Sequence, residues 1–127
     1  MSYGIWIHGK PQPKQRPKFR RNGYAYTPIE TVEYEALIAK AWRDKYGEQQ
    51  VEPENLVIHV DVYTKRYSTS DVDNFLKIAT DGLQGVAYKN DSCIKVAKVV
   101  KIKVDPPGTD EGMRIALFEF SDNIGHG

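Results

Sequence analysis

The sequence predicts an α+β fold, in which one mixed β-sheet is combined with two helices. Segments in which polar and apolar residues alternate, as in strands, outnumber the segments with helical periodicity. These strands and helices do not follow each other in a regular β-α-β series. A chain of 127 residues, 40% of them hydrophobic, suffices for one domain with a real core. We therefore expect a single domain over residues 1–127.

The N-terminal quarter predicts a strand, an extended segment and a hairpin. Residues 3–8 alternate in the manner of a strand. Residues 9–17 contain three prolines, so this segment is extended and cannot occupy the centre of a sheet. Within residues 18–26, the pair Asn22-Gly23 is typical of a tight hairpin turn.

The first helix is predicted to begin at a capping box. Thr27 would cap it, Pro28 would occupy the first helical position, and Glu30 would complete the box. Gly47 would end this helix. The apolar stripe expected to face the core consists of Val32, Leu37, Ile38, Ala41 and Trp42.

The second half predicts a strand, a helix and two further strands. Residues 56–64 alternate, with Leu56 on the apolar face and His59 on a face that is wet or functional. Residues 71–84 have helical periodicity. A long strand is expected over 92–104, and its apolar face would be interrupted by Lys98. The residues assigned to that face are Ile94, Val96, Val100, Ile102 and Val104.

The C-terminal part predicts a turn, a last strand and a loose tail. The sequence Asp-Pro-Pro-Gly at 105–108 is typical of a turn. Residues 113–120 alternate as a strand, and residues 121–127 would be the loose tail.

Composition excludes two classes of protein. No apolar run approaches the roughly 18 residues that a membrane-spanning helix needs, so we expect no membrane association. Aromatic residues make up 11% of the chain and charged residues 28%, which excludes a mostly disordered chain. The single Cys93 cannot form an internal disulfide, so a reducing cytoplasm is the expected location.

Positive charge is concentrated in a proline-rich arm, residues 10–21. The arm holds six basic residues and no acidic one, although the whole chain carries a net charge of only +1. The remainder is therefore acidic. A basic arm on an acidic body favours a polyanionic partner. The alternative is a solvated basic loop, and charge alone does not separate the two.

The strongest chemical motif lies at the start of the second helix. Asp71 and Asp73 are followed by Asn74. A helix N-terminus favours negative charge, but one capping residue would satisfy it. Two carboxylates at this spacing instead suit a hard cation such as Mg²⁺, which prefers oxygen ligands. Simple capping remains the alternative.

Two further groups would join this motif. Lys77 follows Asp73 by four residues and precedes Asp81 by four, so all three share a helix face. They form either a surface charge ladder or a cation held beside a metal site. Asp91 is either a third carboxylate that the fold brings in or an ordinary turn residue.

These residues together resemble the RusA family of Holliday junction resolvases, in particular its phage and prophage members. The resemblance covers about residues 5–120. It differs at Asn90, where the family often has an aspartate. The positions that carry it are Asp71-Val72-Asp73-Asn74, Lys77, Asp81-Gly82-Leu83, Asn90-Asp91 and Lys101, with Pro13-Lys14-Gln15-Arg16-Pro17 and Tyr26-Thr27-Pro28 in support.

The resemblance implies a RusA-like homodimer that acts as a Mg²⁺-dependent endonuclease, with Mn²⁺ as an alternative ion. It would resolve four-way DNA junctions by paired symmetric nicks, in recombination or repair. Asp71, Asp73 and Asp91 would hold the metal, and Lys77 would assist at the scissile phosphate. The residues expected to bind DNA are Lys14, Arg16, Lys18, Arg20, Arg21 and Lys101. Lys95, Lys98 and Lys103 would either meet phosphates with Lys101 or solubilise a sheet edge.

The sequence also allows two other functions. The first is a non-catalytic DNA-binding accessory protein of phage recombination or replication, in which the aspartates only cap a helix. The second is a sugar-transferring enzyme that uses the D-x-D motif. The chain is too short to add a nucleotide-binding domain, which makes the second rival weaker.

Overall fold

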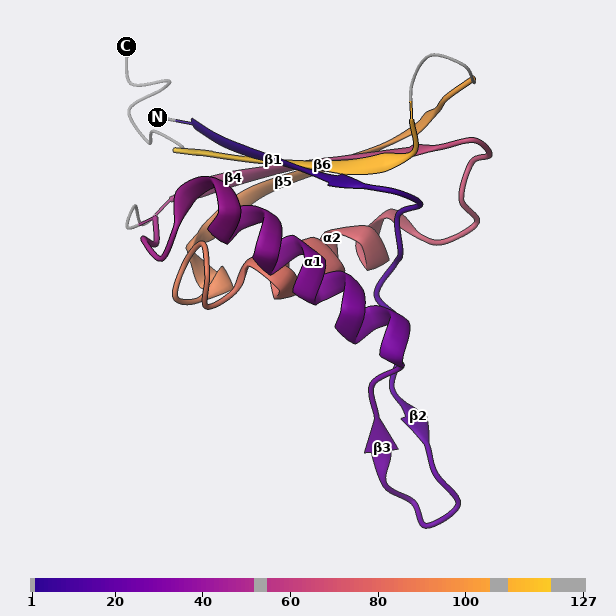
Figure 1. Ribbon diagram of the computed structural model, residues 1–127. Coiled ribbons are helices and arrows are strands. Elements are labelled where there is room, and N and C mark those ends of the chain that lie inside the picture. Colours follow the sequence, from indigo (N-terminus) through magenta and orange to yellow (C-terminus); the bar gives the residue numbers. More distant parts are fainter. Residues whose placement is uncertain (1, 52–54, 106–109, 120–127) are drawn as a thin grey trace.

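A four-stranded sheet with two helices on one of its faces forms the body of the protein, as the computed structural model shows (Figure 1). The structure describes residues 2–51, 55–105 and 110–119. The sheet order is β1-β6-β4-β5; β4 and β5 run parallel, and the other neighbours run antiparallel. The predicted α+β fold with one mixed sheet is confirmed. The elements are β1 (Ser2–His8), α1 (Ile29–Tyr46), β4 (Leu56–Thr64), α2 (Val72–Leu83), β5 (Ile94–Lys103) and β6 (Gly112–Glu119).

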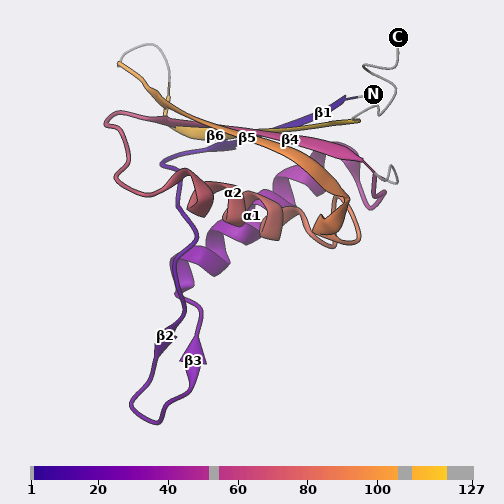
Figure 2. The same cartoon turned by 180° about the vertical axis from the view of Figure 1, so that it is seen from behind.

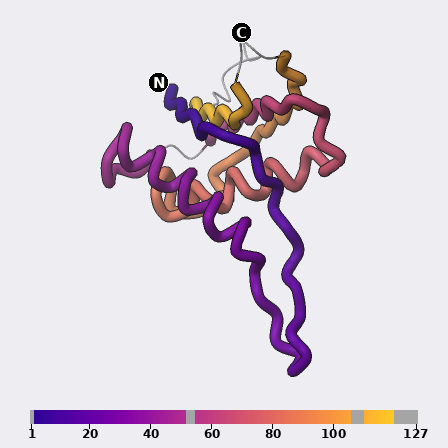
Figure 3. The backbone as a smooth tube through the Cα atoms, turned by 45° about the vertical axis from the view of Figure 1, so that its right-hand side comes forward, coloured from indigo at the N-terminus to yellow at the C-terminus, as the bar shows by residue number. Residues whose placement is uncertain are grey.

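A separate two-stranded hairpin formed by β2 (Lys18–Phe19) and β3 (Ala25–Tyr26) extends away from this body (Figure 3). Gly23 adopts a positive φ of 86° in the turn, a conformation that glycine reaches without strain. The backbone N–H of Arg20 donates to the carbonyl of Tyr24 across the turn. The hairpin predicted from Asn22-Gly23 is therefore confirmed.

The core lies between the helices and the covered face of the sheet. β4 is the central strand, and its inward residues are fully buried. On β1, Ile5 and Ile7 point the same way. These two strands match the alternation predicted from the sequence. The inward residues of β4 are Leu56, Ile58, Val60, Val62 and Thr64.

The predicted start of α1 is wrong by one residue. The helix begins at Ile29, and Pro28 occupies the cap with an extended ψ of 143°. The helix has no side-chain cap bond, so Thr27 does not close a capping box. The carbonyl of Pro28 instead accepts the N–H groups of Thr31 and Val32. Gly47 does end the helix, as predicted, with a φ of 73°.

The predicted stripe of α1 is also partly wrong. Its buried residues are Thr31, Tyr34, Ile38 and Trp42. Val32 and Leu37 of the predicted stripe are about half exposed, at 47% and 48%. Burial depends on where α1 contacts α2 and β1, and side-chain hydropathy alone does not specify that contact.

The predicted apolar face of β5 is wrong because the strand contains a bulge. Ile94 pairs with Leu56, but Val96 pairs with the next residue, Val57, so Lys95 is an extra residue. A one-residue insertion moves every later side chain to the other face. Ile94 therefore faces the helices, whereas Val96, Val100 and Ile102 lie on the opposite face with Lys98. Residues 92 and 93 belong to a short 3-10 turn, not to the strand.

No helix of the described residues lies on the second face of the sheet (Figure 2). Trp6 and Val96 are each 42% exposed on it. The Trp6 ring meets Tyr63 edge-on at 5.5 Å between centroids and lies against Gly112, where any side chain would overlap it. This face is thus apolar in part, and none of the described helices covers it; we call it the uncovered face.

Parts of the predicted turn, strand and tail lie outside the described residues, namely 106–109 and 120–127. In the part of the chain that the structure describes, neither helix has the length and hydropathy to cross a membrane.

Candidate active site

The apolar face of α2 fixes the direction in which its charged residues point. Phe75, Ile78 and Leu83 are buried against the core. Gly82 allows close packing on α1, because a Cβ there would lie 2.9 Å from Ile38. This tight contact anchors the helix and leaves its polar side toward β5 and the solvent.

The first turn of α2 carries the two aspartates of the motif. Asp71 occupies the cap position and Asp73 lies in the first turn. The side chain of Asp71 makes no capping hydrogen bond; its backbone carbonyl accepts the N–H of Asn74 at 3.0 Å. Both carboxylates are exposed. The capping interpretation therefore has no side-chain hydrogen bond in its favour.

A cavity of about 380 Å³ between α2 and β5 brings three of the predicted site residues together. Asp73 and Lys77 enter it from the helix, and Asp91 enters it from the turn before β5. The remaining lining residues are Leu76, Thr80, Ile94, Lys95, Val96 and Ala97. Two carboxylates and a lysine, separated by as many as 18 positions in the chain, thus share one small concave site.

Asp71 is not among the residues that line this cavity. Its backbone is extended, with ψ at 148°, so it lies just outside the helix that carries Asp73. Within residues 2–51, 55–105 and 110–119, no three acidic, histidine or cysteine side chains are grouped closely enough to form a ready-made metal site. The donor set still suits a hard cation, because Mg²⁺ commonly takes one or two carboxylates plus water and phosphate.

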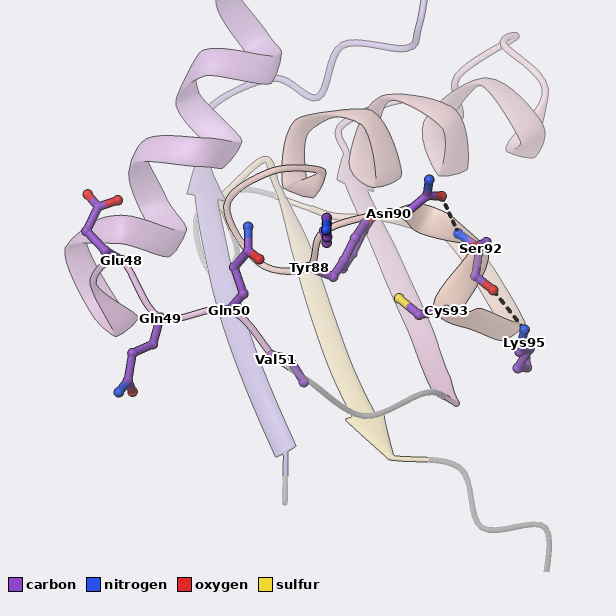
Figure 4. A pocket seen from close by; sticks show the side chains of 10 residues that line it. Glu48, Gln49, Gln50, Val51, Tyr88, Asn90, Ser92, Cys93 and Lys95 are labelled. Atoms are coloured by element: carbon purple, nitrogen blue, oxygen red, sulfur yellow. Dashed lines mark hydrogen bonds between the residues drawn. The ribbon is translucent and has the colours of Figure 1, made fainter.

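Asn90 shapes the turn that presents Asp91. Residues Asp91–Cys93 form a 3-10 turn, η1, and Asn90 is its cap. The Asn90 Oδ1 accepts the backbone N–H of Ser92 at 3.0 Å (Figure 4). Asparagine and aspartate cap equally well. This local role is compatible with either residue at position 90.

A larger polar cavity, of about 980 Å³, lies on the other side of the same turn (Figure 4). It is bordered by Gln50 and Asn90, and Glu48 is the one carboxylate among its lining residues. Lys95 borders both cavities. Burial raises the pKa of the Cys93 thiol, which disfavours its thiolate form. The acidic chemistry therefore belongs to the smaller cavity.

Lys14 ties the base of the arm to both helices. Its ammonium group lies 2.9 Å from Glu35 Oε2 on α1 and 3.1 Å from Asp81 Oδ2 on α2. Its backbone N–H donates to the carbonyl of Asn74 at 2.9 Å. Burial lowers the pKa of Lys14, but the bonds to Glu35 and Asp81 together raise it above the ordinary 10.5. In this structure the ammonium group of Lys14 is therefore paired with carboxylates of the same chain.

Asp81 is shared between two lysines. Its Oδ2 meets Lys14, and its Oδ1 lies 3.4 Å from the ammonium of Lys77. Lys77 is 58% exposed, so this second contact leaves it accessible at the cavity. The predicted pairing of Lys77 with Asp81 on one helix face is present.

The lysines of β5 do not form one continuous row. The bulge places Lys98 on the uncovered face, whereas Lys101 follows the register of Val62 on the covered face. Lys101 donates to the carbonyl of Ser68 at 3.0 Å and so holds the loop that leads to Asp71. β5 is an edge strand, as the solubilised-edge alternative assumed.

The arm, extended here to residues 10–26 so that it includes the whole hairpin, exposes the remaining predicted DNA-binding residues together with aromatic rings. Phe19 and Tyr24 are 73% and 72% exposed, and the Arg20 guanidinium lies 5.0 Å from the Tyr26 ring centroid. The prediction of DNA contacts in this segment rests on its charges alone. The mixture of basic and aromatic residues over 18–26 is the sequence feature that indicates exposed rings beside the cations. The exposed basic residues are Arg16, Lys18, Arg20 and Arg21.

A family model described as endodeoxyribonuclease RusA matches residues 8–110 of the chain. The match runs through the arm, both helices, the acidic cavity and β5. A search of curated proteins found no match.

Proposed function

The chain belongs to the RusA endodeoxyribonuclease family, and from this premise we propose that it resolves four-way DNA junctions in recombination or repair. The observation that carries this proposal is the meeting of Asp73, Asp91 and Lys77 in one cavity beside a basic arm. Such a pair of regions suits a nuclease, which has to hold a polyanion and hydrolyse one of its phosphodiesters.

Mg²⁺ is the proposed cofactor, with Mn²⁺ as the alternative ion. When bound, such an ion activates water and neutralises the charge that develops on the phosphate. Asp73 and Asp91 would hold it from opposite walls of the cavity. Asp71 is proposed as the third ligand. Its exposed side chain makes no capping bond, which leaves the carboxylate available to a metal ion.

Lys77 is proposed to act on the scissile phosphate. Its ammonium group is accessible at the cavity, and Asp81 restrains it at 3.4 Å without burying it. A fixed cation stabilises negative charge on the phosphate oxygens as the bond to the leaving oxygen breaks. Asp81 would therefore act as a positioning residue for Lys77.

DNA binding is proposed to rest mainly on the exposed basic residues of the arm. Contacts with phosphates contribute affinity without sequence information. Lys14 and Lys101 were expected to share this role. Their ammonium groups are bonded internally, which favours a supporting role for both.

Paired symmetric nicks require two active sites, so we propose a homodimer. The uncovered, partly apolar face of the sheet, with Trp6 and Val96 exposed, supports this assignment. A two-fold dimer would suit a junction that is itself close to two-fold symmetric. Sedimentation equilibrium should give twice the chain mass for the wild type and the chain mass for Trp6→Glu. A monomeric wild type that still makes paired nicks would contradict the dimer.

Cleavage of end-labelled four-way junctions, one fixed and one mobile, tests the proposal. With Mg²⁺ or Mn²⁺ we expect nicks in two opposing strands at symmetric positions, and with EDTA none. Linear duplex of the same sequence is the control substrate. Binding to the junction without cleavage under any of these conditions would instead identify a DNA-binding accessory protein.

A further inference from the structure

The hairpin of the arm lies apart from the body of the protein. In three views it extends beyond the start of α1 and away from the sheet (Figures 1, 2 and 3). Its two strands share a ladder of only two residue pairs, Lys18 with Tyr26 and Phe19 with Ala25. So short a hairpin contributes little to the core. We therefore look for its role in binding a partner and not in stabilising the fold.

Two large aromatic rings are exposed on this hairpin. Phe19 is 73% exposed and Tyr24 is 72% exposed, more than the other exposed large hydrophobic residues of the described chain. Neither residue is part of the hydrophobic core. A phenyl ring gains nothing from a phosphate group, so phosphate binding by the arm does not explain Phe19, and it would use the hydroxyl group of Tyr24 without its ring.

The surroundings of the rings are strictly basic. Lys18, Arg20 and Arg21 are their neighbours, and no acidic residue occurs between Lys10 and Ile29. Arg20 stacks over the ring of Tyr26 at 5.0 Å. Cations that track a backbone, interleaved with open aromatic faces, are the combination by which proteins hold unpaired nucleotides. The combination of cations and open rings favours nucleic acid as the occupant, because unpaired nucleotides present phosphates to the cations and base faces to the rings. The acidic body of a second copy of this chain would answer the charge alone.

We propose that Phe19 and Tyr24 stack on unpaired bases at the branch point of the DNA. This inference rests on the proposed junction-resolving function. It adds a site that would distinguish branched DNA from linear duplex by its unpaired bases. At a branch point the base pairs are the least supported by stacking, so opening them costs less than in a continuous duplex. Arg20 and Arg21 would hold the adjoining phosphates while the rings replace the lost stacking.

The test uses a junction with 2-aminopurine at the branch point, in buffer without divalent metal so that no strand is cut. Fluorescence of 2-aminopurine rises when the base leaves its stacked pair. The double variant Phe19→Ala/Tyr24→Ala removes both rings and no charge. Val32→Ala/Leu37→Ala is the matched control, because it removes two half-exposed apolar side chains from α1.

Wild type and the control variant should raise the fluorescence on binding, and the ring-less variant should lose most of that rise. Affinity for the junction should fall by about fivefold or more for each ring removed. Affinity for linear duplex and the salt dependence of binding should stay unchanged, because every cation remains. An unchanged salt dependence also shows that the arm of the variant still docks.

The conservative pair Phe19→Tyr/Tyr24→Phe keeps both rings and should behave as wild type. Equal fluorescence for wild type and the ring-less variant would overturn the inference, whether or not the enzyme cuts. A junction that is cut normally by a protein whose rings are dispensable would leave the proposed function intact. Absence of junction binding by wild type would overturn both. A change of oligomeric state confined to the ring-less variant would assign the rings to a second copy of the chain and overturn base stacking.

Discussion

The arm and the acidic cavity are built in opposite ways. The hairpin of the arm has a two-pair ladder and exposed side chains. The cavity lies between a helix packed on the core and a strand that is paired with β4 along its length except at the Lys95 bulge. Phosphate contacts tolerate movement because charge acts over a distance, whereas catalytic groups need a fixed geometry. The two regions are connected through Lys14, which is bonded to Glu35 on α1 and to Asp81 on α2, and Asp81 in turn contacts Lys77 of the cavity.

The largest effect is expected from the carboxylates of the cavity. Asp73→Asn and Asp91→Asn should each lower Mg²⁺-dependent cleavage by on the order of 100-fold or more, because the site would lose a ligand for the ion that neutralises charge at the reacting phosphate. Gel-shift affinity for the junction should remain, since the arm is intact. A junction-binding variant that cuts at the wild-type rate would remove that residue from the site.

Thermal unfolding controls for the folding of these variants. Without metal, their melting temperatures should equal or slightly exceed that of wild type, because one like charge is removed. Addition of Mg²⁺ should raise the wild-type melting temperature more than theirs, since only the folded, intact site binds the ion well.

Lys77→Ala should have the next largest effect. We expect cleavage at saturating enzyme to fall about 10- to 100-fold with little change in junction affinity, because the lysine acts on the transition state. Single-turnover kinetics separate the two quantities. Equal losses of rate and of affinity would make Lys77 a general binding residue.

Lys14→Met tests the link between the two regions. Loss of two charge-assisted hydrogen bonds to partly buried carboxylates should lower the free energy of unfolding by about 1.5 kcal/mol. Lys40→Met is the matched control, because its ion pair with Asp44 is exposed and should contribute less than about 0.5 kcal/mol. Chemical denaturation measures both. A salt slope lowered by about one unit would instead assign Lys14 to a phosphate.

The same variant has a defined pH dependence. The pKa of Lys14 is raised in the folded protein, so its contribution is complete below the ordinary value of 10.5. It is lost as the pH rises through the higher folded value. The difference in stability between wild type and Lys14→Met should therefore be constant near neutral pH and narrow above about pH 10.5.

Arg20→Ala/Arg21→Ala should produce the smallest change in catalysis. Cleavage at saturating junction should be unchanged. The slope of log K against log salt should fall by roughly two units if both residues meet phosphates. An unchanged slope would exclude these two arginines from the DNA interface.

Local patterns determined most of the elements of the fold. The alternation in β1 and β4, the Asn22-Gly23 turn and the helical period of α2 act over a few residues, so they are legible in the sequence. Of the site residues predicted from the sequence, Asp73, Lys77 and Asp91 line one cavity and Asp71 does not; their role in catalysis stays a prediction.

Tertiary structure alone decided three features: the register of β5, the buried face of α1 and the partners of Lys14 and Lys101. A single extra residue, Lys95, transfers Val96 and the residues after it to the uncovered face. Lys14 and Lys101 look like free cations in the sequence, yet each meets partners at least 21 positions away. Such outcomes depend on which surfaces come together over long separations, and neither periodicity nor charge spacing contains that information.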